Sequence, residues 1–242
     1  MICRPFKCIF VHIPKTAGRS IEIFFMNRLN LDRENSEHRA QLLIANNDDP
    51  ARGTEKLSHL SASEYVQCGH ITAQDFSSFY KFSFVRNPWA RLVSEYRYRS
   101  FLSHKNFKDF VMNKLPSPGR DDKYRHIMSQ TAMLYDQDGR LLVDYVGKFE
   151  KLQQDFEQVC KYMGFRNSAL PHVNSSDKKS RELRRKARSF LRRNGESELG
   201  RYVDFYDMET REFVADLYHE DIMNFSYDFD DALGDSKAPA LD

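Results

Sequence analysis

The chain has 242 residues, enough for one sizeable domain, and its 40% hydrophobic and 13% aromatic content excludes a disordered chain. A net charge of +2 excludes binding to a polyanion through bulk charge, so attraction to an anion must come from local clusters. The four cysteines form no C-x-x-C pair and no zinc-like grouping with histidines, and no segment is apolar for long enough to span a bilayer. This pattern predicts reduced thiols in a soluble, cytoplasmic protein.

The first predicted unit is a strand, a tight turn and a helix. Residues 8–13 (CIFVHI) form a continuous apolar run, which is typical of a strand buried on both faces of a parallel sheet. Apolar residues recur at helical spacing over 21–29, so we expect a helix that begins near 17–18. The turn at 14–20 (PKTAGRS) combines a lysine, a glycine and two hydroxyls. This order of elements points helix-terminal amides at an anion.

A second strand, turn and helix follow a polar excursion over residues 30–60, in which a short helix is expected around 36–45. The strand is 81–85 (KFSFV), and Pro88 suits the start of the next helix. Arg86 follows the strand directly, and Ser94 lies two turns into the helix. The pair either holds one phosphate from two sides or consists of a surface residue and a small packing residue.

The remaining chain continues the alternation of strands and helices. We expect a loop at 114–122, a strand and an amphipathic helix over 143–165, a basic helical segment at 178–193 and a late helix at 203–227. This order predicts an α/β fold with a central, mainly parallel sheet flanked by helices. The expected domain is 1–232, with a flexible C-terminal tail at 233–242.

The first turn offers backbone N–H donors, the Lys15 ammonium and two hydroxyls to an anion; the alternative is an ordinary turn with a surface lysine. A Walker-type loop needs G-x-x-x-x-G-K-[ST], and the chain has no glycine at the required distance before Lys15. The sequence also shows no clear acidic magnesium site. Both points disfavour ATP or GTP hydrolysis.

The segments IPKTAGRS and FVRNPWARLVSEY together resemble the paired signature of sulfotransferases that use 3′-phosphoadenosine 5′-phosphosulfate (PAPS). CGHITAQDF (68–76) is similar to the Gly-His segment of the uronosyl 2-O-sulfotransferase branch of carbohydrate sulfotransferases. VGKFEKLQQDF, LPHVNSS and LYHEDIMNFSY follow the pattern of the wider group, so the resemblance covers about residues 8–229. It implies a P-loop-like, three-layer fold.

The resemblance also implies residue roles. Lys15 would contact the sulfate and the bridging oxygen, and Arg86 and Ser94 would hold the 3′-phosphate. The residues expected to wrap the 5′-phosphate are Thr16, Ala17, Gly18, Arg19 and Ser20. Two residues depart from the family pattern: Arg19 replaces a small or hydroxyl residue, and Cys68 replaces a second histidine. The second departure puts uronic acid specificity in doubt.

His70 matches the histidine proposed as the base in the 2-O branch, and its alternative is a hydrogen-bonded structural histidine. Asp75 is the reserve candidate, although it could equally cap a helix. His12 is expected to be buried structure, and Trp89 has no assigned role. The basic segment at 178–193 is either a solvated amphipathic helix or a funnel for an anionic acceptor or cofactor.

The sequence therefore predicts an enzyme that moves a sulfuryl group from PAPS to a hydroxyl acceptor, expected to be a glycan, and releases adenosine 3′,5′-bisphosphate (PAP). No metal, nucleic acid or membrane span is expected. The alternatives are a nucleotide kinase or NTPase of similar topology and a non-catalytic protein that binds PAP or a glycan. The sequence indicates neither the acceptor's identity nor the oligomeric state.

Overall fold

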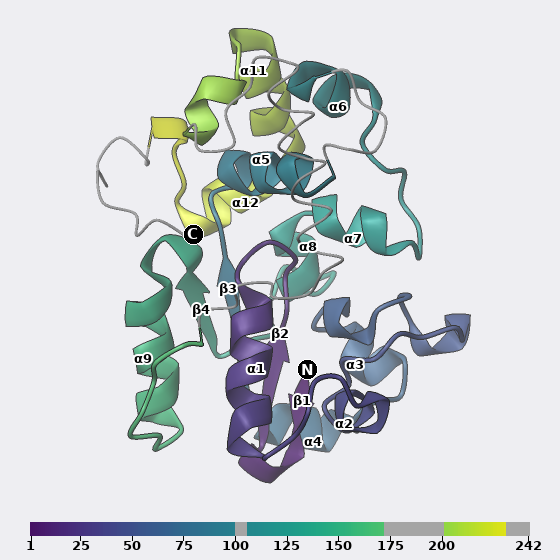
Figure 1. Ribbon diagram of the computed structural model, residues 1–242. Coiled ribbons are helices and arrows are strands. Elements are labelled where there is room, and N and C mark those ends of the chain that lie inside the picture. Colours follow the sequence, from purple (N-terminus) through teal and green to yellow (C-terminus); the bar gives the residue numbers. More distant parts are fainter. Residues whose placement is uncertain (100–105, 172–200, 231–242) are drawn as a thin grey trace. The chain divides into compact units, whose positions relative to one another are not determined.

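The structure is a computed structural model that describes residues 1–99, 106–171 and 201–230 (Figure 1). The chain forms two compact units, Met1–Val85 with Pro118–His172 and Arg86–Ser117 with Val173–Asp242. The basic segment at 178–193 and the tail at 233–242 lie outside the described residues. No helix in the described ranges has the length and apolarity needed to cross a bilayer.

A four-stranded sheet forms the centre of the first unit, in the order β1, β2, β3 and β4. β2 (Cys8–Val11), β3 (Tyr80–Val85) and β4 (Tyr145–Lys148) run parallel to one another, and β1 (Ile2–Cys3) pairs antiparallel to β2. The predicted strand at 81–85 is confirmed, and so is the mainly parallel sheet; the strand predicted over 8–13 forms but ends at Val11.

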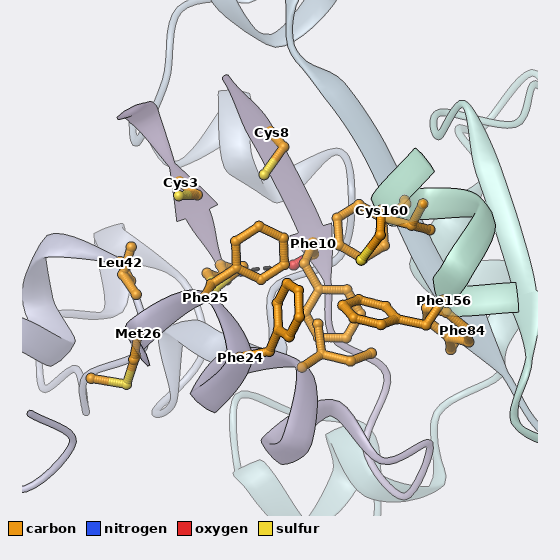
Figure 2. Close-up of a cluster of buried hydrophobic side chains, with 14 of the residues drawn as sticks. Cys3, Cys8, Phe10, Phe24, Phe25, Met26, Leu42, Phe84, Phe156 and Cys160 are labelled. Carbon is orange, nitrogen blue, oxygen red and sulfur yellow. Dashed lines mark hydrogen bonds between the residues drawn. The ribbon is translucent and has the colours of Figure 1, made fainter. Parts of the chain in front are cut away.

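Helices α1 (Gly18–Arg28) and α9 (Leu152–Tyr162) pack against aromatic side chains of this sheet (Figure 2). Phe10 of β2 stacks on Phe82 of β3 with ring centroids 5.2 Å apart. Phe24 of α1 meets Phe156 of α9 edge to face, at 4.7 Å, so the two helices share one apolar cluster. Burying each such side chain contributes about 1.5–3 kcal/mol, which fixes α1 and the turn before it against the sheet.

Shorter helices complete the first unit. The excursion between α1 and β3 contains α2 (Ser36–Gln41), α3 (Glu64–Gln67) and α4 (Ala73–Ser78), together with the 3₁₀ turns Pro50–Arg52 and Leu57–His59. The segment before β4 contains α7 (Asp122–Ile127) and α8 (Gln130–Leu134). The predicted loop at 114–122 therefore ends where α7 begins.

The second unit is helical in its described part, with α5 (Pro88–Arg99), α6 (Phe107–Asn113), α11 (Met208–Leu217) and α12 (His219–Phe225). Its core includes Trp89, whose Nε1 donates to the Arg211 carbonyl at 3.1 Å. The expectation of one helix over 203–227 is wrong. Tyr218 leaves helical geometry at φ −116° and ends α11, so the segment folds as two helices.

Candidate functional site

The turn between β2 and α1 has an unusual backbone. Lys15 and Ala17 have φ values of 73° and 63°, in the left-handed region that residues with a Cβ rarely adopt. Such conformations cost on the order of 1–3 kcal/mol each and persist where the surrounding structure enforces them. Ala17 is the N-cap of α1, and its methyl group cannot accept from the first N–H groups of the helix. This helix start therefore suits an anion.

Gly18 allows α1 to begin close to the end of β2. A Cβ at Gly18 would lie 2.0 Å from Cδ2 and 2.1 Å from Nε2 of His12, so no other residue fits without a shift. The His12 ring is held in place because its Nδ1 lies 2.8 Å from Oε1 of Glu22 and its face stacks on Phe10. His12 is thus a buried support for the turn, as the sequence predicted.

Glu22 is a buried carboxylate directly behind this turn, with a 2% exposed side chain. Its second oxygen accepts from Nη1 of Arg33 at 2.9 Å. Burial by itself raises the pKa of Glu22, but the charges and hydrogen bonds of His12 and Arg33 outweigh burial and lower that pKa to about 2. The carboxylate therefore stays ionised at neutral pH and accepts the Nδ1–H of His12.

The other predicted turn residues differ in exposure. Lys15 and Ser20 are half-buried, and Arg19 is exposed. Thr16 is fully buried, and its hydroxyl donates to the Ile13 carbonyl at 2.7 Å. Because this proton is already used inside the turn, Thr16 can donate to an anion only through its backbone N–H.

Arg86 and Ser94 belong to the second unit and are both half-buried. Asn87 accepts the Ala90 N–H through Oδ1 at 3.2 Å, and Pro88 is the first residue of α5. The start of α5 is therefore capped by the chain itself, unlike the start of α1.

His70, the predicted base, lies between α3 and α4 and is 7% exposed. Its Nδ1 lies 3.0 Å from Nη2 of Arg52, and its Nε2 lies 2.9 Å from the Arg52 carbonyl. A guanidinium only donates, so Nδ1 accepts and Nε2–H donates. Burial lowers the pKa of His70, which favours the neutral ring. Its lone pair is thus engaged by Arg52. The reserve candidate Asp75 is not a cap, because Thr72 caps α4 and accepts the Asp75 N–H.

A second histidine, His59, was not singled out by the sequence. Its Nδ1 lies 2.5 Å from Oδ1 of Asp122, and its ring meets His12 edge to face at 4.9 Å. Burial lowers the pKa of His59 to about 4, against the opposing effect of Asp122, so the ring is neutral. The Asp122 carboxylate accepts a hydrogen bond from Nδ1–H of His59, which leaves the lone pair of the ring on Nε2. A base oriented by a carboxylate is a recurrent catalytic arrangement.

Asp122 also lies close to Lys56 and His126. Its Oδ2 lies 2.8 Å from Nζ of Lys56 and 3.5 Å from Nε2 of His126. Burial raises its pKa, but the hydrogen bonds from His126 and His59 outweigh burial and hold the pKa well below its usual range. No local spacing signals the His59–Asp122 pair, because the two residues come from separate segments; only Asp122 and His126 stand at helical spacing.

The described geometry therefore gives a turn that is suited to an anion, with a carboxylate-oriented histidine packed against its support, His12. A family model described as "Sulfotransferase family" matches residues 1–228. The chain belongs to the sulfotransferase family. The match covers residues of both units, so it supports the predicted reaction class for the whole chain.

The chain is also 28% identical over 109 residues to an uncharacterized protein from Archaeoglobus fulgidus, and the match covers 42% of this chain and 81% of that protein. No solved structure matches the chain. Family membership confirms the transferase prediction and implies a hydroxyl-bearing acceptor.

Proposed function

We propose that this sulfotransferase uses PAPS as donor and the hydroxyl group of a carbohydrate as acceptor, on a P-loop-like fold in which residues 1–232 act as one domain. The observation that carries the proposal is the turn at 14–18. Its left-handed Lys15 and Ala17 and the uncapped start of α1 suit a phosphate, in a chain that belongs to the sulfotransferases.

The turn fits the 5′-phosphosulfate end of this donor. The backbone N–H groups of residues 16–19 would bind its oxygens, whereas the Ser20 N–H already donates to the Ala17 carbonyl at 3.0 Å. The Lys15 ammonium would neutralise charge that develops on the bridging oxygen. Arg86 and Ser94 bind the 3′-phosphate through a guanidinium fork and a hydroxyl. When bound, the donor supplies an activated sulfuryl group and a phosphate leaving group. Lys15 provides the cation that stabilises departure, so the transfer step itself needs no metal.

The base that takes the acceptor proton is assigned to His59, with His70 as the alternative that the sequence predicts. Asp122 orients His59 and leaves Nε2 as the proton acceptor, and the ring touches the support of the turn. His70 would have to release Arg52 before its Nδ1 could take a proton. Both assignments remain proposals that kinetics can separate.

Two rival functions keep the same fold. A nucleotide kinase or NTPase would bind ATP with Mg²⁺, and a non-catalytic relative would bind PAP or a glycan without turnover. The carbohydrate assignment rests on the resemblance of residues 68–76 to the uronosyl branch, and Cys68 in place of a histidine speaks against uronic acid specificity within that class.

The deciding experiment titrates the protein with PAP and with ATP–Mg²⁺ side by side. We expect PAP at a hundredfold excess over its Kd to stabilise the fold by about 2.7 kcal/mol, measured as a thermal shift. A large shift with ATP–Mg²⁺ and none with PAP would contradict the proposal. Transfer of label from [³⁵S]PAPS to a glycan panel then separates the enzyme from a protein that only binds PAP.

A further inference from the structure

Three side chains outside the predicted anion site converge in the first unit. His59 comes from the 3₁₀ turn Leu57–His59, and Asp122 and His126 lie one turn apart on α7. Their ligand atoms all lie within 4.8 Å of one another. Within residues 1–99, 106–171 and 201–230, no other group of three or more histidine, cysteine or acidic side chains brings its ligand atoms this close together.

We propose that His59, Asp122 and His126 form a binding site for a divalent transition-metal ion of the zinc class. Two imidazoles and one carboxylate are the donor set that such ions prefer, whereas Mg²⁺ and Ca²⁺ prefer oxygen alone. The donors come from two segments of the chain, and their side chains are only 8%, 14% and 8% exposed.

The spacing of the donors fits this ion. Metal–ligand bonds of about 2.0–2.2 Å place the ligand atoms of a tetrahedral site ~3.3 Å apart. Nδ1 of His59 lies 2.5 Å from Oδ1 of Asp122, and Nε2 of His126 lies 3.5 Å from Oδ2. A modest opening of the His59–Asp122 hydrogen bond therefore admits the ion, and water completes the coordination.

Lys56 would compete with the metal ion for the Asp122 carboxylate. Its ammonium lies 2.8 Å from Oδ2 of Asp122 and now supplies the charge that balances this carboxylate. The Lys56 side chain is 43% exposed, so it can turn into water when a dication takes its place. Removal of this amine should therefore strengthen metal binding, an effect in the opposite direction from loss of a ligand.

Occupancy has a consequence that rests on the proposed function. A metal on Nδ1 of His59 requires the tautomer whose proton is on Nε2, and that nitrogen then cannot accept a proton from a hydroxyl. The ion would inhibit sulfuryl transfer and would not assist it. The metal-binding prediction itself stands whether or not His59 is the base.

The test uses chelator-treated protein and no substrate. Co²⁺ is followed by the visible absorption of a tetrahedral centre, and Zn²⁺ by isothermal titration calorimetry, with Mg²⁺ as the ion that should not bind. We expect one ion per chain and a loss of affinity of about 10–100-fold in His126→Gln and in Asp122→Asn. Lys56→Met should bind roughly tenfold more tightly.

His219→Gln is the matched control, because His219 is an exposed histidine of the second unit. It should bind as the wild type does. Equal affinities in His126→Gln and His219→Gln, or only the spectrum of solvated Co²⁺, would overturn the site. Thermal melts without metal establish that each variant is folded. If the ligand variants do not fold, unchanged or weaker affinity in Lys56→Met overturns it. PAP binding, measured separately, reports on the proposed function alone.

Discussion

The two strand–turn–helix segments, residues 8–28 and 80–99, begin their helices in different ways. The first turn holds Lys15 and Ala17 at positive φ and has no side-chain cap. Within residues 80–99 no residue has positive φ, and Asn87 caps α5 by accepting the Ala90 N–H. The first turn thus stores strain and keeps amides available, whereas the second uses ordinary capping chemistry.

This difference separates the tasks the two turns can perform. We propose that amides at the start of α1 and the Lys15 ammonium form a preorganised cradle for an anion whose charge changes during a reaction. At the second turn, Asn87 already satisfies a helix-terminal amide. We propose that an anion there is held by side chains such as Arg86 and Ser94, which would suit this turn to anchoring a ligand.

The largest expected effect follows from this difference in task between the two turns. Lys15→Ala should lower the turnover number for sulfuryl transfer by about 10²–10³-fold and leave the affinity for PAP nearly unchanged, because Lys15 acts on charge that develops in the transition state. Arg86→Ala should weaken PAP binding by about tenfold or more through loss of a charged hydrogen-bond fork. Calorimetry with PAP and initial rates with [³⁵S]PAPS measure the two quantities.

Lys7→Ala is the matched control, because Lys7 is an exposed lysine of the first unit that also has a positive φ. It should change neither rate nor affinity. If Lys15→Ala and Arg86→Ala lowered PAP affinity alike and had the same rate at saturation, the two turns would not differ in task.

Local pattern predicted much of this comparison. The apolar run at 8–13 and the helical spacing that follows located β2 and α1, and KFSFV located β3. These elements depend on neighbours in sequence, which is the information that a single chain displays. The positive φ of Ala17 carries no such signal, because alanine is a residue that normally avoids it.

Contacts between residues far apart in the chain could not be predicted from the sequence. The partner of His59 is Asp122 from another segment, and His70 is engaged by Arg52 from the excursion before it. Both contacts arise from packing, so a motif match could single out His70 but could not show how its lone pair is used. The structure therefore added a second base candidate.

A kinetic comparison of these histidines tests that addition. His59→Asn should lower the turnover number by about 10²-fold, since general base catalysis contributes about 10²–10⁴-fold. His70→Asn should cost less because Arg52 engages the ring. PAP affinity and thermal stability are measured alongside the rates. A large loss of rate in His70→Asn with none in His59→Asn would return the base role to His70.

The smallest expected effect concerns the buried carboxylate behind the first turn. Glu22 has a folded-state pKa of about 2 against an ordinary value of 4.5. A carboxyl group whose pKa is lowered by folding stabilises the protein at pH values above its ordinary pKa. This stabilisation is lost as the pH falls toward the pKa of the folded state. Linkage gives a loss of roughly 2 kcal/mol between about pH 6 and about pH 3.

Urea denaturation of the wild type and Glu22→Gln at these two pH values isolates this contribution. Gln cannot ionise, so the free energy of unfolding of Glu22→Gln should fall less steeply with acid, and the other acidic groups cancel in the difference. The comparison uses the change in the free energy of unfolding with pH and not its absolute value, because Glu22→Gln also weakens the contacts to His12 and Arg33. Parallel curves would mean that Glu22 does not anchor the turn through its charge. The contrast with the second turn would then rest on the positive φ values and the missing side-chain cap of α1.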